Sequence, residues 1–236
     1  MSGNQNTILE RAQFLQSQVS DVAQRYGRQA SEIKIIAISK FFSSQDVLAA
    51  YDAGFRYFGE SRVQELVIKH QELAQLADLK WQFIGHLQTN KINAVLSKIS
   101  LLQSLDSWRL AQELDRKLGA LGKELDVLVQ VNITNDEAKH GLDTAEVPQF
   151  LDDVATLENL NIKGLMTIGK RSQDPREVEA GFADLRALQE KLRPNVSPNI
   201  DLSELSMGMS QDYALAIKHG ATLIRVGSYL FGQRSY

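Results

Sequence analysis

The fold of this chain is decided by an apolar run, IKIIAIS at 33–39, and by the seven similar runs that follow it. Each run is apolar at both odd and even positions, which is typical of a parallel strand covered on both faces. The later runs are FRYFG (55–59), WQFIG (81–85), ISLLQS (99–104), LDVLVQVNI (125–133), NIKGLMTIG (161–169), LSELSMG (202–208) and TLIRVGS (222–228). We therefore expect eight parallel strands.

Segments with helical periodicity separate these runs, at 44–53, 61–77, 88–98, 107–119, 145–157, 175–191 and 211–219. Strands that alternate with helices indicate an α/β protein, and eight such units can close into a (β/α)8 TIM barrel. An open doubly wound sheet is the alternative. We place it second because no G-x-G-x-x-G follows an early strand and no break separates two halves.

The barrel is preceded by an amphipathic helix at 7–26, which we expect to pack on its outside. Its apolar residues recur at steps of three and four, at Ile8, Ala12, Leu15, Val19 and Val22. The total of 236 residues suits one barrel of roughly 250 residues. We see no long linker or low-complexity tract, so residues 1–236 are predicted to form a single domain.

Composition excludes several classes of protein. Acidic residues number 29 and basic residues 26, so the charge does not favour nucleic acid or an anionic membrane as a partner. The chain has no cysteine, which fits a reducing compartment. It shows no secretory leader and no apolar stretch of ~18 residues, so we expect a cytoplasmic protein. The four histidines lack the spacings of zinc motifs, and no structural metal is predicted.

Lys40 is the first candidate functional residue, because functional groups of such barrels follow the strands. It shares the parity of Ile36 and Ile38 and therefore lies at the mouth of the barrel on their side of the strand. Aliphatic surroundings favour the neutral amine, which is the form that attacks an aldehyde. The alternative is a solvated loop lysine.

The tails of the last two strands predict a phosphate site. They are SMGMSQD (206–212) and RVGSYLFG (225–232), at the place where barrels commonly bind phosphate. Their glycines would let backbone amides approach a dianion, and their serines would add hydroxyl donors. These residues are Gly208, Gly227, Ser206, Ser210 and Ser228. Ser210 would also cap a helix that begins at Gln211; an ordinary turn and cap is the alternative.

Arg225 lies in an apolar strand, where a guanidinium needs a partner. A pyridine nitrogen would serve, because the permanently charged arginine would donate to it in its unprotonated form. A carboxylate such as Glu60 is the alternative partner.

Two further tails, GESRVQE (59–65) and GHLQTNK (85–91), bring polar residues to the same rim. They include Ser61 and His86. A histidine of this kind is more often a structural residue than a catalyst.

Seven motifs, in this order along nearly the whole chain, resemble those of the pyridoxal phosphate homeostasis proteins, which are relatives of the amino-terminal barrel of bacterial alanine racemases. The motifs are AISK (37–40), FGESRVQE (58–65), WQFIGHLQTNK (81–91), NDEAKHGL (135–142), GLMTI (164–168), LSMGMSQD (205–212) and IRVGSYLFG (224–232). The chain departs from the family at Gln82, where histidine is usual, and at Ser61, where many members have asparagine.

The resemblance implies that pyridoxal 5'-phosphate is the cofactor, bound as a Schiff base on Lys40. Arg225 would face its pyridine nitrogen, and Ser210, Gly227 and Ser228 would hold its phosphate. Ser206 and Gly208 are expected beside the phosphate, and Ser61, His86 and Met166 in the pocket wall. Lys139, in the NDEAKHGL loop, is predicted to be unnecessary for the Schiff base but to help the cofactor arrive or leave.

The implied function is that of a monomeric carrier or regulator in vitamin B6 homeostasis and amino-acid balance, without an established reaction, with apo-enzymes as recipients. The alternative is a pyridoxal-phosphate-dependent amino-acid racemase, which needs a second base opposite the lysine. In racemases this second base is commonly a tyrosine, and the resemblance implies that it comes from an additional β domain. We expect no room for such a domain after the last strand. Tyr57 and Tyr229 would be the candidates here. A cofactor-free Schiff-base aldolase is the remaining class.

Overall fold

The eight predicted strands close into a parallel barrel in chain order. The structure is a computed structural model that describes residues 3–134, 140–169 and 172–233. Its strands are β1 Lys34–Ile38, β2 Tyr57–Glu60, β3 Lys80–Phe83, β4 Leu101–Leu105, β5 Leu125–Gln130, β6 Leu160–Met166, β7 Glu204–Met209 and β8 Leu223–Val226. Because β1 pairs with β8, the sheet is closed and the open doubly wound alternative is wrong.

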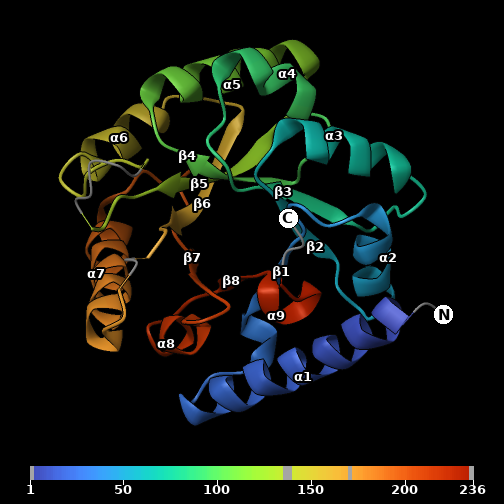
Figure 1. Ribbon diagram of the computed structural model, residues 1–236. Helices are drawn as coiled ribbons and strands as arrows, with labels where there is room; N and C mark the ends of the chain where they lie inside the picture. The colour runs from blue at the N-terminus through green and yellow to red at the C-terminus, as the bar shows by residue number, and fades with distance from the viewer. Residues whose placement is uncertain (1–2, 135–139, 170–171, 234–236) are drawn as a thin grey trace.

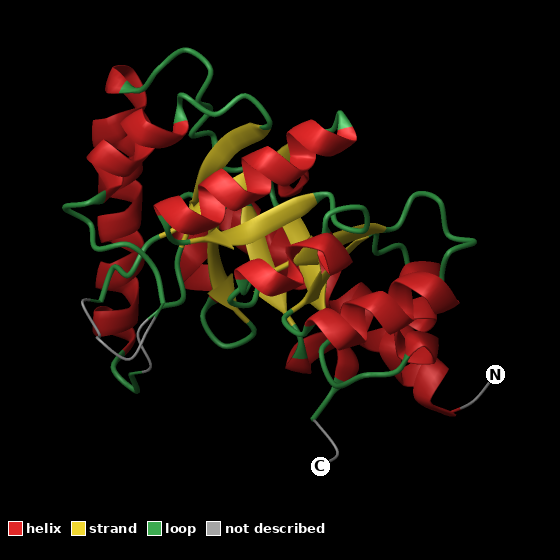
Figure 2. Cartoon of the chain, turned by 90° about the horizontal axis from the view of Figure 1, so that it is seen from above, coloured by secondary structure: helices red, strands yellow, loops and turns green. Residues whose placement is uncertain are grey.

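Helices follow the strands and surround them, as the view from above shows (Figure 2). They are α2 Ser44–Asp52, α3 Val63–Glu72, α4 Ile92–Val95, α5 Trp108–Leu121, α6 Val147–Val154, α7 Pro175–Leu192, α8 Tyr213–Lys218 and α9 Ser228–Phe231. The segment predicted as one helix at 88–98 instead begins with a 3-10 turn, Thr89–Lys91, and continues as the short α4. The last predicted strand was too long at its end, because Ser228 already belongs to α9.

The amino-terminal helix α1, Gly3–Arg25, packs outside the barrel as predicted. It lies against α2, α8 and α9, and Figure 1 shows it running beneath them in blue. Its predicted apolar stripe is buried throughout, at Ile8, Ala12, Leu15, Val19 and Val22. Complete burial of one such aliphatic side chain contributes about 1.5–3 kcal/mol, so this stripe fastens α1 to the barrel.

The interior of the barrel holds a small apolar core, which lies beneath the carboxyl ends of the strands. It consists of Ile36, Ile38, Leu101, Leu128, Met166 and Leu223, with Tyr57 and Ile84 packed against it. Ile36 and Ile38 therefore face inward, which confirms the parity on which the placement of Lys40 depends. The much larger second core fills the space between the strands and the helices.

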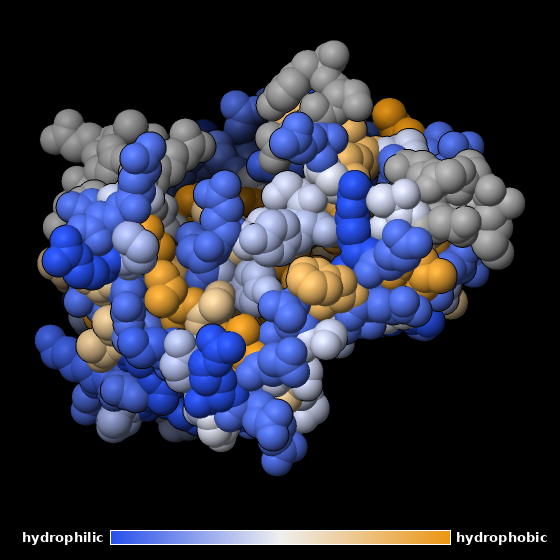
Figure 3. Space-filling model, turned by 60° about the horizontal axis from the view of Figure 1, so that its bottom comes forward, coloured by the Kyte–Doolittle hydropathy of each residue, from blue (hydrophilic) through white to orange (hydrophobic). Residues whose placement is uncertain are grey.

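The outer surface in Figure 3 carries mostly hydrophilic side chains, with apolar ones in small separate groups. Single exposed apolar residues are normal on a water-facing surface. None of the described helices combines the length and the apolar character needed to cross a lipid bilayer.

Candidate functional site

A cavity of about 700 Å³ opens at the carboxyl ends of the strands. This volume lies in the usual range of small-molecule sites. Its wall includes Lys40 after β1, Ser210 after β7, and Arg225 and Gly227 at the end of β8. The first and the last two βα tails, which are far apart in the sequence, thus contribute to one site because β1 and β8 are neighbours in the closed barrel.

Lys40 is half buried at the cavity wall, beside the aliphatic Ile38 and Ile84. The chain turns sharply after it, because Phe41 adopts a positive φ of 71°, a conformation that is unusual for a bulky residue. The amide of Phe41 donates a hydrogen bond of 2.7 Å to the carboxylate of Glu65 in α3. The turn that follows Lys40 is therefore anchored to helix α3.

A buried ion pair supports the residue before Lys40. The Lys69 ammonium donates to the Ser39 carbonyl at 2.7 Å and to Glu60 Oε1 at 2.6 Å. Ser39 Oγ donates to the same Glu60 oxygen at 2.7 Å. Burial raises the pKa of Glu60, while Lys69 opposes the rise. Since Glu60 binds Lys69, the alternative in which Glu60 pairs with Arg225 is wrong.

Arg225 is held by neutral groups. Its guanidinium donates to Ser206 Oγ at 2.6 Å and to the Thr167 carbonyl at 2.7 Å. Ser206 in turn donates to Gln103, and Gln103 to Gln82, so a polar chain crosses the barrel from β8 to β3. No carboxylate among the described residues hydrogen-bonds to Arg225.

Burial lowers the pKa of Arg225 to about 10, and the charge of Asp212 opposes this shift. At neutral pH the guanidinium therefore remains a cation. Its position at the cavity wall leaves it available to a ligand that offers a hydrogen-bond acceptor.

The tails of β7 and β8 meet at Ser210. Its hydroxyl accepts a hydrogen bond of 3.3 Å from the amide of Gly227, and Ser228 lines the same part of the cavity. Helix α8 begins at Tyr213 with Asp212 as the preceding residue. The prediction that Ser210 caps a helix from Gln211 is therefore wrong; its hydroxyl joins two strand tails instead.

Five predicted site residues line the cavity: Lys40, Arg225, Ser210, Gly227 and Ser228. Ser206 is not among the lining residues; its hydroxyl accepts a hydrogen bond from Arg225 and donates one to Gln103, and its expected place beside the phosphate stays a prediction. Met166 belongs to the barrel interior. Ser61 and His86 lie in the loops after β2 and β3 and are not among the lining residues.

Gly208 also lies away from the cavity, against α8. It has a φ of +87°, and an added Cβ would approach the Cβ of Ala216 to 2.5 Å. Backbone conformation and close packing therefore require glycine at this position. The expected contact of its amide with a phosphate stays a prediction.

The sequence prediction missed Asp212, which lines the cavity and accepts a hydrogen bond from the Met209 amide. Burial raises the pKa of Asp212. The motif SMGMSQD already contained this residue, but its orientation depends on the turn after β7. Phe42, Met209, Gln211 and Gln233 were missed as well.

The two tyrosines considered as a second base do not line this cavity. Tyr57 borders a different pocket together with Lys34 and Lys80, at the amino ends of the strands. Tyr229 is half exposed in α9 and packs edge-on against Tyr213. Lys139 lies outside the described residues.

Comparison with known proteins gives concordant matches along the chain. A model of the alanine racemase N-terminal domain matches residues 14–235. A pyridoxal phosphate homeostasis protein of Aquifex aeolicus is 36% identical over 96% of this chain and 98% of that protein. One of Helicobacter pylori is 41% identical over 84% of this chain and 87% of that protein.

Comparison with solved structures leads to the same family. PipY of Synechococcus elongatus PCC7942, with pyridoxal phosphate bound, has a TM-score of 0.85 and 38% identity, and the match covers 95% of this chain and all of that one. The alanine racemase of Corynebacterium glutamicum shares the fold at a TM-score of 0.72 with 13% identity, and this chain spans 62% of it. The chain belongs to the family of the alanine racemase N-terminal domain and, within it, to the pyridoxal phosphate homeostasis proteins.

Proposed function

We propose that this protein binds pyridoxal 5'-phosphate in the cavity at the barrel mouth and acts in intracellular vitamin B6 homeostasis. The observation that carries the proposal is the meeting of Lys40, Arg225 and Ser210 in one cavity of suitable volume. A lysine amine, a cation without a carboxylate hydrogen bond and a hydroxyl beside a backbone amide match the aldehyde, ring nitrogen and phosphate of this cofactor. PipY, which contains the cofactor, supports the same ligand.

Lys40 would hold the cofactor as a Schiff base. Lys40 lines the cavity together with the aliphatic Ile38 and Ile84, and a primary amine is the group that forms a Schiff base with an aldehyde. The Glu60–Lys69 pair fixes the backbone just before it. The residues present therefore fit a covalent anchor.

Arg225 would donate to the pyridine nitrogen. Ser206 and Thr167 occupy two of its donors and hold the guanidinium in one orientation. Bound pyridoxal phosphate supplies an electron sink for substrate carbanions, and it does so best with a protonated ring. A cationic arginine favours the unprotonated ring, so this site suits cofactor storage better than turnover.

Ser210, Gly227 and Ser228 would hold the phosphate. Gly227 belongs to the short connection between β8 and α9, and an added Cβ would approach the Ile38 carbonyl oxygen to 3.3 Å. The tight packing of this connection brings its backbone close to the cavity. Hydroxyl and amide donors suit a phosphate dianion.

The racemase alternative receives less support from this cavity. Racemisation needs an acid or base on each face of the substrate carbon. The described lining residues include neither tyrosine nor histidine, and Tyr57 borders the pocket at the other end of the barrel. We therefore propose a carrier or regulator that passes its cofactor to apo-enzymes.

We also propose that residues 1–236 form one domain and that the protein is a cytoplasmic monomer. The closed barrel supports the single domain, and the absence of cysteine suits a reducing compartment. Sedimentation equilibrium of the purified protein tests the monomer, and a concentration-dependent mass would contradict it.

Absorbance and covalent trapping test the cofactor site. The wild type, incubated with pyridoxal phosphate and desalted, is expected to show a visible absorption band, and borohydride reduction followed by peptide mapping should label Lys40. Lys40→Ala should lose the band. Lys80→Ala is the matched control, because Lys80 lies at the other end of the barrel. A colourless wild type, or label on another lysine alone, would defeat the assignment.

A further inference from the structure

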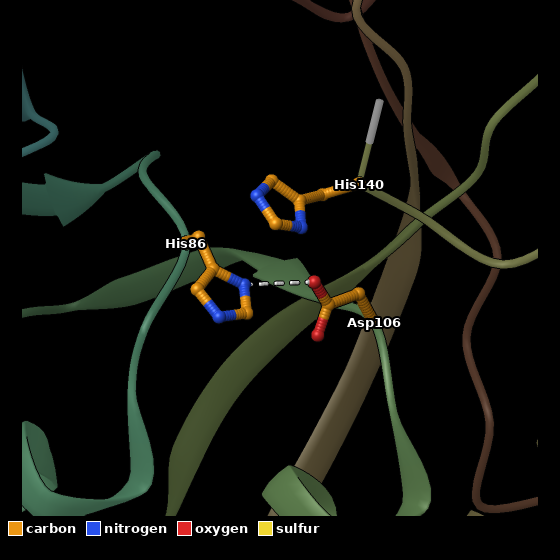
Figure 4. A group of neighbouring side chains, drawn as sticks. All are labelled: His86, Asp106 and His140. Atoms are coloured by element: carbon orange, nitrogen blue, oxygen red, sulfur yellow. Dashed lines mark hydrogen bonds and ion pairs between the residues drawn. The ribbon is translucent and has the colours of Figure 1, made fainter. Parts of the chain in front are cut away.

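A second group of ligand-type side chains lies on the barrel rim, outside the lining of the cofactor cavity. It consists of His86, Asp106 and His140, whose ligand atoms all lie within 4.8 Å of one another. His86 Nδ1 is 3.2 Å from Asp106 Oδ2. The two imidazole rings stack with centroids 4.3 Å apart and planes inclined by 11°. Figure 4 shows a nitrogen of each ring on the side that faces the carboxylate.

Three neighbouring strands bring these residues together. His86 follows β3, Asp106 directly follows β4, and His140 precedes α6 in the connection after β5. Strand order in the closed barrel makes β4 the central one of the three, so the carboxylate lies between the two histidine-bearing tails.

Hydrogen bonds from the strands anchor the backbone at His140 and next to His86. Gln130 at the end of β5 donates a hydrogen bond of 2.8 Å to the His140 carbonyl. Ser104 in β4 donates one of 2.6 Å to the carbonyl of Gly85, the residue before His86. Asp106 immediately precedes Ser107, the N-cap of α5. The three side chains are therefore presented from anchored positions, and such positions favour ligand binding.

We propose that His86, Asp106 and His140 form a binding site for a divalent transition-metal ion such as Zn²⁺. Two ligands bound about 2.1 Å from one ion lie roughly 3.0–3.4 Å apart at tetrahedral or octahedral angles, and the His86–Asp106 distance of 3.2 Å meets this requirement. The ligand atoms of the group lie within 4.8 Å of one another, and on metal binding the exposed His140 ring would close the remaining distance by rotation of its side chain.

The donor set selects the class of metal. Imidazole nitrogen favours zinc, nickel, cobalt and copper over magnesium and calcium, which prefer sites built wholly from oxygen. The Asp106 side chain is only 8% exposed, whereas that of His86 is 43% exposed. A carboxylate screened from water favours a cation, and the exposed side of the site leaves coordination positions for water or a small anion.

Calorimetry tests the site directly. Titration of the wild-type protein, loaded with its cofactor, with zinc chloride is expected to show one equivalent of binding. His86→Ala, His140→Ala and Asp106→Asn should each weaken it at least tenfold. His219→Ala is the matched control, because its ring contacts Glu179 at 2.9 Å on the outer helices and forms an ordinary histidine–carboxylate pair. Its zinc affinity should equal that of the wild type.

NMR spectra of the histidine ring nitrogens of the wild-type protein test the metal site without the use of variants. Zinc should shift the ring signals of His86 and His140 and leave those of His70 and His219 in place. The proposal would be overturned if no one-to-one complex formed, or if all three variants bound zinc as tightly as the wild type. It would also be overturned if Lys40→Ala alone lost zinc binding, because that result would place the ion on the cofactor. The cofactor absorption band is expected to persist in His86→Ala, so the two proposals fail separately.

Discussion

Replacing Lys69 by methionine removes the cation from the buried cluster beneath Lys40. Lys69 is 5% exposed and Glu60 fully buried, and Glu60 Oε2 has no hydrogen-bond partner among the described residues. The variant keeps much of the apolar side-chain length but leaves the Glu60 carboxylate without its ion pair. Loss of one partner of a buried pair costs about 3–5 kcal/mol in general.

Protonation of Glu60 sets an upper limit on this cost. Neutralising a carboxyl group with an ordinary pKa of 4.5 costs about 3.4 kcal/mol at pH 7 and about 0.7 kcal/mol at pH 5, because each pH unit contributes about 1.36 kcal/mol. The lost hydrogen bond to the Ser39 carbonyl adds about 1 kcal/mol. We therefore expect Lys69→Met to lower the free energy of unfolding by about 3–4 kcal/mol at pH 7 and about 1–2 kcal/mol at pH 5.

The direction of this pH dependence follows from proton binding. A folded-state pKa above the unfolded one means that the folded protein binds more protons between the two values, so stability falls as pH rises from about 4.5. Without Lys69 the pKa of Glu60 rises further, and the range over which stability falls with rising pH extends to higher pH.

Urea unfolding at pH 5 and pH 7, followed by circular dichroism, measures the effect. The double variant Glu60→Gln/Lys69→Met is the control, because it removes both charges and should be less destabilised at pH 7 than Lys69→Met alone. A destabilisation that is the same at both pH values, or a double variant less stable than the single one, would refute this account of the cluster.

Four further variants test the site and its support. Ser210→Ala and Gly227→Val should each weaken cofactor retention without unfolding the chain. Ser210→Ala loses one charge-assisted hydrogen bond, worth about 1.5–3 kcal/mol, whereas Gly227→Val keeps its amide but shifts the connection between β8 and α9, because the new Cβ would approach the Ile38 carbonyl oxygen to 3.3 Å. Unchanged dissociation constants in both would move the phosphate site elsewhere. Gly208→Ala should lower the urea midpoint, since the new Cβ would meet Ala216 at a strained positive φ; an unchanged midpoint would show that α8 adjusts freely. Lys139→Ala should retain the cofactor absorption band but slow cofactor exchange, and exchange rates equal to those of the wild type would contradict a role for this lysine.

The eight strands were predictable because each apolar run carries its own signal. A strand buried on both faces is apolar at both odd and even positions, and this pattern in IKIIAIS or LDVLVQVNI does not depend on the rest of the chain. The parity of Ile36, Ile38 and Lys40 also follows from strand geometry alone. The positions of Lys40 and Arg225 at the cavity could be predicted for the same reason.

Local geometry at the turns could not be predicted in this way. Ser206 and Ser210 lie four residues apart in one tail, yet the first is buried against Arg225 and the second joins Gly227. Their separation depends on the positive φ of Gly208 and on the packing of α8, which a pattern of residue types does not specify. Asp212 was missed for the same reason.

Residue patterns within short segments were enough to predict the α/β class, the eight strands, the outer helix and the lysine at the end of the first strand, because these features depend on local periodicity. Which polar groups meet depends instead on how the elements pack together. The Glu60–Lys69 pair, the polar chain from Arg225 to Gln82 and the cluster of His86, Asp106 and His140 each join different elements. The histidine spacing in the sequence excluded a zinc motif, but closure of the barrel places three strand tails side by side, and distance along the chain no longer limits which side chains share a site.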